Sequence, residues 1–391
     1  MKLLPRDASR LVARYRRIFP AVGLVGPRQS GKTTLARQII GTTSGSVAYF
    51  DLERQADFAA TAEVDLFLDG LDHDLVVIDE VQRRPELFVG LRSAIDADRR
   101  EGRFLLLGSA SPELLRDSSE SLAGRIGYVE LPPLNLREVL GSYDRTTHWR
   151  RGGFPNSLRL DDEDSTIWRE NFVRTYLERD VRELRPNIDA GALARLLPML
   201  AHVHAQTLNY SQLAKSLSLS SPTVKRYVDL LEASFFVRTL PPYFTNARKR
   251  LVKSPKLYVR DSGLLHNLLG VATQAQLLRH PQLGASWEGY VIEQLCQILP
   301  PGTQPFGFRT ADGAEIDLVL LPRGPGGPVA IEIKLSDAPS LSRGNYEAIA
   351  AVAPEVTYVV TPGARPTARG QGVLLRSLED LLAELPERLG A

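Results

Sequence analysis

The sequence predicts an α/β protein of two or three domains, the first of them built on a parallel sheet, and three observations support this prediction. The 391 residues are too many for one ordinary domain of ~150 residues. In the N-terminal part, short strands that are apolar throughout alternate with segments of helical period, which is typical of a parallel sheet covered on both faces. Hydrophobic residues make up 43% and charged residues 24% of the chain, a composition typical of globular proteins with buried cores.

Simple counts argue against three classes of protein. No apolar run approaches the ~18 residues that a membrane-spanning helix needs. The N-terminal segment MKLLPRDASRLVARYRRIF lacks the uninterrupted apolar stretch of a signal peptide. Cys296 is the single cysteine of the sequence, which excludes an internal disulfide and a zinc site of several thiolates. We therefore expect a protein of the reducing cytoplasm without a membrane partner.

The first domain is expected over residues 1–150. A helix with an apolar row is expected at 8–19, and the strand at 22–26 runs into a glycine turn that leads to a second helix. Helical segments such as 86–96 separate the later strands. The expected strands are VGLVG (22–26), VAYFDL (47–52), LVVID (75–79) and RFLLLG (103–108). Because these strands are apolar along their whole length, we expect them to form one buried sheet.

Residues 26–33, with the sequence GPRQSGKT, fit the phosphate-loop pattern G-x-x-x-x-G-K-[ST]. The glycines allow a loop whose backbone N–H groups point at phosphates, and the following helix adds its positive dipole end. We expect Lys32 to bridge the β- and γ-phosphates of ATP and the Thr33 hydroxyl to bind Mg²⁺; an ordinary glycine turn is the alternative. The residues expected to contact the nucleotide are Gly26, Pro27, Arg28, Gln29, Ser30, Gly31, Lys32, Thr33 and Thr34.

An acidic pair follows at the end of the strand LVVID. We expect Asp79 to join the Mg²⁺ shell and Glu80 to orient and deprotonate the attacking water, so hydrolysis is predicted as well as binding. Ser109, at the end of the next strand, is expected near the γ-phosphate, with a simple strand-end cap as the alternative. Arg125 could reach a nucleotide phosphate of its own subunit or of a neighbour in a homo-oligomer, and an ordinary surface salt bridge is the alternative.

Residues 151–275 are expected to form a helical linker and a winged helix-turn-helix. A long amphipathic helix is expected at about 163–185. The segments 210–217 and 220–228 have the pattern of helix, turn and helix, with Ser221 as N-cap and Pro222 in the first helical position. The expected strands of the wing are FFVR (235–238) and KLYVR (256–260).

Basic residues gather in this middle segment. Residues 201–261 contain ten Lys or Arg and three Asp or Glu, in a chain whose net charge is only +2. A local basic block of this kind favours a polyanion as partner, and early residues of the second helix reach DNA in helix-turn-helix proteins. The alternative is a module that joins domains or contacts protein. The residues expected to contact DNA are Lys225, Arg226, Arg248, Lys249, Arg250, Lys253 and Lys256.

Residues 276–391 return to alternating helices and strands. Glu332 and Lys334 share one face of an expected strand, and a hairpin can place Asp317 beside them. Glu288, on the preceding helix, could supply a third carboxylate. Acids and a lysine grouped in this way can bind Mg²⁺ and activate a water for phosphodiester hydrolysis. A solvated strand face with ion pairs is the alternative.

With these motifs in this linear order, the sequence resembles the prokaryotic AAA-type ATPases that carry a C-terminal domain of unknown function. It is also similar to the archaeal ATPases of the STAND group. The resemblance spans about residues 10–385 and rests on GPRQSGKTTLARQI, VVIDEVQRRPELF, LLLGSASPELL, SLAGRI, GGFP, the helices between Leu213 and Tyr227, KRLVKSPKLYVRDSGLLHNLLG, SWEGYVIEQL and EIDLVLL with VAIEIK. It implies a P-loop AAA-like core, a winged-helix middle and a restriction-endonuclease-like C-terminal domain similar to PD-(D/E)xK nucleases. It also maps magnesium ligands onto Glu288, Asp317 and Glu332, with Lys334 as the catalytic lysine.

The sequence therefore predicts a cytoplasmic, Mg²⁺-dependent ATPase whose nucleotide state controls a half that binds DNA and that has the residues of a DNA-cleaving site. Two alternatives stay open. One is an ATP-driven signalling switch that recognises a protein partner. The other is a DNA remodeller, such as a branch-migrating ring, with an inactive nuclease fold.

Overall fold

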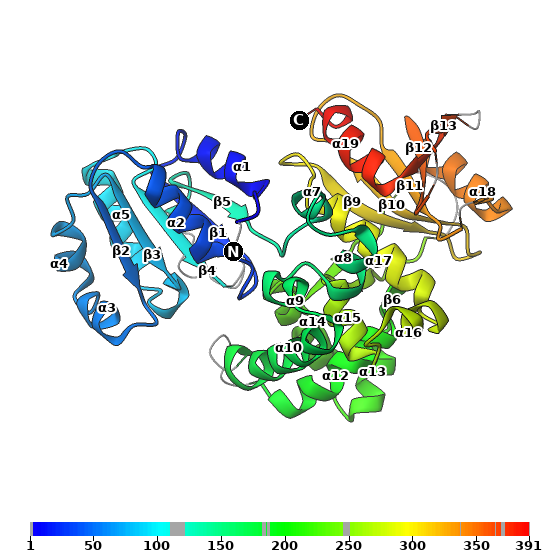
Figure 1. The fold of residues 1–391 in the computed structure, drawn as a ribbon, viewed down its shortest axis with the longest axis horizontal. Coiled ribbons are helices and arrows are strands. Elements are labelled where there is room, and N and C mark those ends of the chain that lie inside the picture. The colour runs from blue at the N-terminus through cyan, green and yellow to red at the C-terminus, as the bar shows by residue number, and fades with distance from the viewer. Residues whose placement is uncertain are drawn as a thin grey trace. The chain divides into compact units, whose positions relative to one another are not determined.

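The computed structural model describes residues 3–109, 122–181, 185, 188–244, 251–336, 338–363, 365–368 and 372–390. The chain divides into two compact units. Unit 1 contains Met1–Leu134 and Asp229–Phe236, and unit 2 contains Asn135–Val228 and Val237–Ala391. Most of unit 1 is blue and cyan in Figure 1, and most of unit 2 runs from green to red. None of the helices in the described ranges has the length and apolar character that a membrane crossing requires.

Unit 1 is built on a sheet that has, over its described residues, five parallel strands in the order β2-β3-β4-β1-β5. These strands are β1 (Ala21–Val25), β2 (Val47–Asp51), β3 (Leu75–Asp79), β4 (Phe104–Gly108) and β5 (Ile126–Glu130). Strands β1, β3 and β4 are buried at every position, which explains why their sequences are apolar throughout. The predicted parallel sheet is confirmed.

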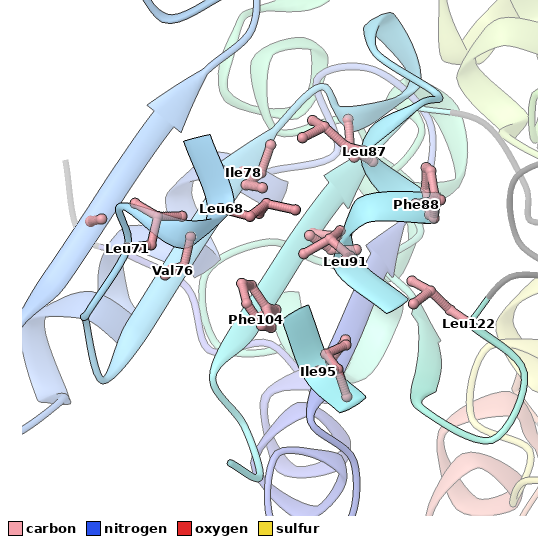
Figure 2. Packing of buried hydrophobic residues seen from close by; sticks show 14 of the residues in the cluster. Leu68, Leu71, Val76, Ile78, Leu87, Phe88, Leu91, Ile95, Phe104 and Leu122 are labelled. Atoms are coloured by element: carbon pink, nitrogen blue, oxygen red, sulfur yellow. The ribbon is translucent and has the colours of Figure 1, made fainter. Parts of the chain in front are cut away.

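Two hydrophobic cores cover the two faces of this sheet. The covering helices are α1 (Ala8–Tyr15), α2 (Lys32–Thr42), α3 (Gln55–Ala60), α4 (Val64–Asp69) and α5 (Leu87–Ala97), with a short 3₁₀ turn η1 (Val81–Arg83) after β3. Val76 and Ile78 of β3 belong to the core under α4 and α5, which Figure 2 shows from close by. Leu75 and Val77 of the same strand belong to the core under α1 and α2. One apolar strand thus serves both cores, because side chains alternate along it.

Unit 2 begins with a helical part. Its helices are α7 (Leu136–Val139), α8 (Arg145–Arg151), α9 (Pro155–Arg159), α10 (Asp162–Thr175) and α12 (Ala190–His202). The long helix predicted at 163–185 is present as α10, which continues into the π-helical segment η3 (Tyr176–Asp180). Residues 182–184 of that prediction lie outside the described residues.

The helix-turn-helix segment follows. It consists of β6 (Gln206–Thr207), α13 (Tyr210–Leu217), α14 (Ser221–Ala233), β7 (Val237–Leu240) and β8 (Lys256–Val259), and then come α15 (Ser262–Leu268) and α16 (Gln274–Arg279). The end of α14, residues 229–233, belongs to unit 1. Both predicted helices are present, and the predicted strand at 256–260 matches β8 to within one residue. The other strand was predicted at 235–238 but begins two residues later, at Val237. β8 pairs antiparallel with β6 and with β7. The N-cap of α14 differs from the prediction, because the Ser220 hydroxyl accepts the Thr223 N–H and the helix already begins at Ser221.

The C-terminal part of unit 2 is a mixed sheet with helices. Its elements are α17 (Leu283–Cys296), β9 (Gln304–Arg309), β10 (Glu315–Leu321), β11 (Val329–Ile333), α18 (Arg343–Val352), β12 (Val356–Thr361), β13 (Thr367–Ala368), β14 (Val373–Ser377) and α19 (Leu378–Arg388). Within the described ranges the strand order is β13-β14-β12-β11-β10-β9, with β9 at one edge. β10 pairs antiparallel with β9 and β11, whereas β12 pairs parallel with β11 and β14.

The connection between β7 and β8 does not stand free of this sheet. Isolated bridges join Pro242 to Gly307 and Leu251 to Thr310. The Tyr243 N–H donates to the Gly307 oxygen at 2.7 Å. Both ends of the predicted wing therefore lie along the β9 edge of the C-terminal sheet.

Candidate functional site

The predicted phosphate loop connects β1 to α2 at the carboxyl edge of the unit 1 sheet. A Cβ on Gly26 would stand 2.2 Å from the backbone oxygen of Leu131, so this close approach requires glycine. Gly31 ends the loop with a φ of 102°, a left-handed conformation that favours glycine, and it is the N-cap residue of α2. The loop therefore leads directly into the N-terminus of an eleven-residue helix, where backbone N–H groups and the dipole favour an anion.

Lys32 lies in the first turn of α2, with only 5% of its surface exposed. Its Nζ donates to the backbone oxygens of Gly26 at 2.9 Å and of Pro27 at 3.0 Å. The ammonium thus lies within the curve of the loop that the sequence predicted to hold phosphates. Arg6 supports the loop from another side, because its Nη1 donates to the Ser30 backbone oxygen at 2.7 Å.

The carboxylate of Asp79 receives two hydroxyl donors. Thr33 Oγ1 donates to Asp79 Oδ2 at 2.7 Å, and Tyr49 Oη donates to the same oxygen at 2.9 Å. Burial raises the pKa of Asp79, and these two hydrogen bonds oppose that effect without cancelling it. The two predicted metal ligands, Thr33 and Asp79, are therefore in direct contact, and their oxygens can belong to the coordination shell of one Mg²⁺ ion.

Glu80 lies directly after β3, in a left-handed conformation with a φ of 56°. Ser109 Oγ donates to Glu80 Oε2 at 2.7 Å, and Gln82 Nε2 donates both to Ser109 Oγ at 2.9 Å and to Glu80 Oε2. Burial raises the pKa of Glu80, but the charge of Lys32 and the hydrogen bonds from Ser109 and Gln82 outweigh it and lower the pKa below its ordinary value. The carboxylate is therefore ionised at neutral pH, the state that a general base needs.

The strand order explains why these groups meet. Strand β4 lies between β1, which leads into the phosphate loop, and β3, which ends in Asp79. Since all three strands are parallel, their carboxyl ends lie at one edge of the sheet, where ligands bind in open α/β folds. The position of Ser109 beside Glu80 follows from this order.

The remaining predicted loop residues occupy the same turn with different surroundings. Arg28 forms an ion pair with Glu53 at 3.5 Å. Gln29 has a φ of 63°, which is uncommon for a residue other than glycine. The Ser30 side chain is buried, and its hydroxyl makes no hydrogen bond within the described part of the chain. The Thr34 side chain is exposed on α2, so a nucleotide contact of this residue would come from its backbone.

Arg125 is not part of this arrangement. Its Nε and Nη2 donate to the two carboxylate oxygens of Asp96 at 2.7 and 2.9 Å. It precedes β5, and its backbone oxygen accepts the N–H of Ala21 at the start of β1. The five residues of β5 span about 16 Å. Arg125 therefore lies at the amino ends of the strands, whereas the phosphate loop lies at their carboxyl ends. The structure thus contradicts a contact with the nucleotide of the same subunit, and a contact in a neighbouring subunit stays a prediction.

Three residues of the site were not predicted from the sequence. Gln82 carried a usable signal, because it lies two residues after the acidic pair. Tyr49 lies on β2 and Arg6 precedes α1, and their contacts depend on the strand order and on the packing of the N-terminal segment. No local pattern identifies such residues.

The residues predicted to contact DNA fall into three groups. Lys225 and Arg226 are exposed on α14, and Lys253 is exposed before β8. Arg248, Lys249 and Arg250 lie outside the described residues. Lys256 is 6% exposed, and its Nζ lies 2.9 Å from Glu288 Oε1. The prediction for Lys256 is wrong, because all four residues of β8 are buried and a buried lysine pairs with acids instead of facing solvent.

The C-terminal acids do come together, from α17, β10 and β11. We call the group Glu288, Glu315, Asp317 and Glu332 the carboxylate cluster. Lys256 Nζ pairs with Glu288, Glu315 and Asp317, and Lys334 Nζ donates to Glu332 Oε1 at 2.6 Å. Within its described residues, the chain has no group of three or more His, Cys, Asp or Glu arranged to hold a metal ion.

Burial and mutual repulsion act on the protonation of these acids. Burial, followed by the charge of Asp317, raises the pKa of Glu288 to about 7. The same two causes raise the pKa of Glu332 to about 8. Burial lowers the pKa of Lys256, but the charges of Glu288, Asp317 and Glu315 outweigh it and raise the pKa well above its ordinary value. Lys256 is therefore an ammonium at neutral pH.

Family models match three parts of the chain. An AAA domain matches residues 19–140, a domain of unknown function (DUF8612) matches residues 143–275, and a second domain of unknown function (DUF4143) matches residues 283–381. The AAA match agrees with the parallel sheet and phosphate loop of unit 1.

Two mycobacterial proteins are similar over most of the chain. An uncharacterized protein of Mycobacterium tuberculosis and one of Mycobacterium bovis are each 43% identical over 359 residues, which cover 92% of this chain and 80% of the relative. Among solved structures, a Walker-type ATPase of Pyrococcus abyssi is 14% identical, with a TM-score of 0.46, over 68% of this chain and 96% of its own. A STAND protein of Pyrococcus horikoshii with a tetratricopeptide repeat sensor is 14% identical, with a TM-score of 0.27, over 75% of this chain and 49% of its own. At these TM-scores neither likeness carries a functional conclusion.

Proposed function

This chain belongs to the family of the two mycobacterial relatives, and we propose that it is a cytoplasmic, Mg²⁺-dependent ATPase whose nucleotide state controls DNA binding by unit 2. The match to an AAA domain supports an ATPase of the P-loop type at a general level. The observation that carries the proposal is the 2.7 Å hydrogen bond between Thr33 and Asp79. It joins the helix after the phosphate loop to the acidic end of β3, as a shared Mg²⁺ shell requires.

The binding step uses the loop and the start of α2. Backbone N–H groups of residues 26–33 and the Lys32 ammonium would hold the phosphates, with Lys32 exchanging its bonds to Gly26 and Pro27 for phosphate oxygens. Thr33 and Asp79 would hold Mg²⁺, whose chemistry when bound is to neutralise negative charge on the β- and γ-phosphates.

The hydrolytic step uses the residues around Glu80. The Glu80 carboxylate would accept a proton from the attacking water while its lowered pKa keeps it ionised before the reaction. Ser109 and Gln82 hold the carboxylate in one orientation through Oε2. Oε1 is then the oxygen from which Glu80 would act on the water.

The coupling to DNA rests on the helix-turn-helix of unit 2. Lys225 and Arg226 are exposed near the start of α14, where such modules contact phosphates and base edges. The net positive charge of residues 201–261 supports the same partner. A second candidate is an ATP-driven switch that recognises a protein, and the burial of Lys256 favours it by removing one cation from the proposed DNA surface.

One experiment separates these candidates. ATP hydrolysis by the full chain is measured at low salt without DNA and with single-stranded, duplex and branched DNA. Stimulation by one DNA form is expected, with no turnover in Lys32→Ala and normal turnover in Thr42→Ala, a control at the far end of α2. Hydrolysis that is the same with every DNA would contradict the coupling and favour the protein switch. No hydrolysis under any condition would contradict the ATPase itself.

A further inference from the structure

We infer that the carboxylate cluster of unit 2 holds the ammonium of Lys256 as its cation and does not take a divalent metal ion. The residue comes from β8 of the helix-turn-helix segment, whereas the acids come from α17, β10 and β11. The inference concerns unit 2 alone and does not depend on the proposed ATPase function.

The position of the ammonium carries the inference. Lys256 Nζ lies 2.9 Å from Glu288 Oε1, pairs with Glu315, and lies 3.7 Å from Asp317 Oδ1. It therefore occupies the point toward which the three carboxylates converge. Tyr258, two residues further along the same strand, donates to Glu288 Oε1 at 2.7 Å. Two side chains of β8 thus donate to the same carboxylate oxygen of Glu288.

The other acids are also engaged. Asp317 Oδ2 accepts the N–H of Ile333 at 2.8 Å. Glu332 Oε1 accepts from Lys334 Nζ at 2.6 Å and from Asn345 Nδ2 at 2.8 Å. Glu332 Oε2 is buried and makes no hydrogen bond within the described residues. Oxygens of Glu288, Asp317 and Glu332 that a Mg²⁺ shell would use thus already accept hydrogen bonds from protein donors.

A divalent ion at this point would meet a like charge. Two charges of the same sign that lie a few ångströms apart inside a protein repel each other, and a divalent ion doubles this repulsion relative to a monovalent one. Metal binding would therefore require Lys256 to leave the cluster. The residues present do not fit a magnesium site while the lysine stays.

The strand that bears Lys256 is fixed on several sides. β8 is paired on one side with β6 and on the other with β7. Arg238 of β7 and Arg260, which follows β8, both donate to Glu293 of α17 at 2.8 Å. After the wing, the Val252 N–H donates to the Arg309 oxygen of β9. These contacts hold the ammonium in place, so we expect that the carboxylate cluster does not cleave DNA.

Binding of Mn²⁺ to the nucleotide-free full chain, followed by electron paramagnetic resonance, tests this inference. Wild type and Asp317→Asn should bind Mn²⁺ equally, because the cluster takes no metal in either. Lys256→Met should gain one Mn²⁺ site that the double variant Lys256→Met/Asp317→Asn lacks. Lys253→Met, which removes an exposed lysine three residues earlier, is the matched control and should gain none.

Two results would overturn the inference. The first is a Mn²⁺ site in wild type that disappears in Asp317→Asn but persists in Asp79→Asn. The second is a folded Lys256→Met protein, shown by circular dichroism, that gains no site. If Lys256→Met does not fold, the comparison of Mn²⁺ binding by wild type and by Asp317→Asn decides alone. Metal-dependent nicking of supercoiled DNA by wild type would also contradict the inference if Asp317→Asn abolishes that nicking.

Discussion

The hydroxyl of Ser109 donates a hydrogen bond of 2.7 Å to Oε2 of Glu80, although 29 residues separate the two in the sequence. The bond forms because β4 lies beside β3 and both strands end at the same edge of the sheet. It connects the residue proposed as general base to the strand that also borders the phosphate loop. The protonation and orientation of Glu80 therefore depend on Ser109.

Glu80→Gln should retain ATP binding and lose turnover. Glutamine preserves the shape and can still accept the Ser109 hydrogen bond, but it cannot take a proton from water, so kcat should fall by about 100-fold or more. Calorimetric titration with ATP and phosphate release measure the two effects. Glu86→Gln, an exposed acid at the start of α5, should turn over normally. Wild-type turnover in Glu80→Gln would refute the assigned role.

Ser109→Ala should shift the pH dependence of hydrolysis. The Ser109 hydrogen bond is one of the interactions that lower the pKa of Glu80, so its loss should raise that pKa. Because the base acts in its ionised form, the acid limb of the kcat profile should move to higher pH. A profile that keeps its acid limb while kcat falls would mean that Ser109 acts on the nucleotide and not through Glu80.

Arg125→Ala should leave ATP affinity unchanged within about twofold. Arg125 lies at the amino ends of the strands, away from the phosphate loop, and it pairs with Asp96. Turnover measured over a range of protein concentrations tests the remaining role in a neighbouring subunit. A loss of kcat in Arg125→Ala that is seen only at high protein concentration would establish that role. A weakened affinity in dilute protein would contradict the placement of Arg125.

Lys225→Ala/Arg226→Ala should weaken binding to duplex DNA and make it less dependent on salt. Each phosphate contact removed should lower the slope of log K against log salt by about one unit, so the double variant should lose about two. Arg343→Ala on α18 provides the control, because its side chain is 93% exposed and pairs with Glu347 one turn further along the helix. An unchanged slope in the double variant would exclude α14 from the DNA surface.

Glu293→Gln should destabilise unit 2 at neutral pH and much less in acid. Burial raises the pKa of Glu293, but Arg238 and Arg260 outweigh it and lower the pKa to about 2. A carboxylate whose pKa is lower in the folded state stabilises the fold at pH values above its unfolded-state pKa of about 4.3. This stabilisation is lost as the pH falls toward 2. This pKa shift corresponds to about 3 kcal/mol of unfolding free energy. The difference in Tm between Glu293→Gln and wild type should therefore be largest near pH 7 and smaller at pH 3. An equal difference at both pH values would refute this coupling.

The parts of the nucleotide site that are local in sequence could be predicted from it. The loop and the acidic pair are short patterns, and the apolar strands on either side indicate their structural context. Arg125 shows the limit of this reasoning, because its motif says nothing about which edge of the sheet it occupies. Tyr49 shows the same limit, since its contact with Asp79 exists only because β2 neighbours β3.

Lys256 shows a different limit. Counting charges along residues 201–261 treats every lysine as part of the surface, but a strand buried on both faces can hold a lysine when acids surround it. The acids that do so lie at least 32 residues away in the sequence. The predicted grouping of Glu288, Asp317 and Glu332 was sound, and what the sequence did not reveal was the cation among them.

The bridges from Pro242 and Leu251 to β9 also have a consequence for solubility. An edge strand with unpaired backbone groups is a template for pairing with other chains, and proteins commonly cover such edges. Here the ends of the β7–β8 connection cover part of β9. A C-terminal fragment that begins near residue 280, between the segments matched as separate domains, would lose this cover. The acids of its carboxylate cluster would also be left without Lys256. This fragment should self-associate, whereas a fragment that retains residues 237–391 should keep that edge protected.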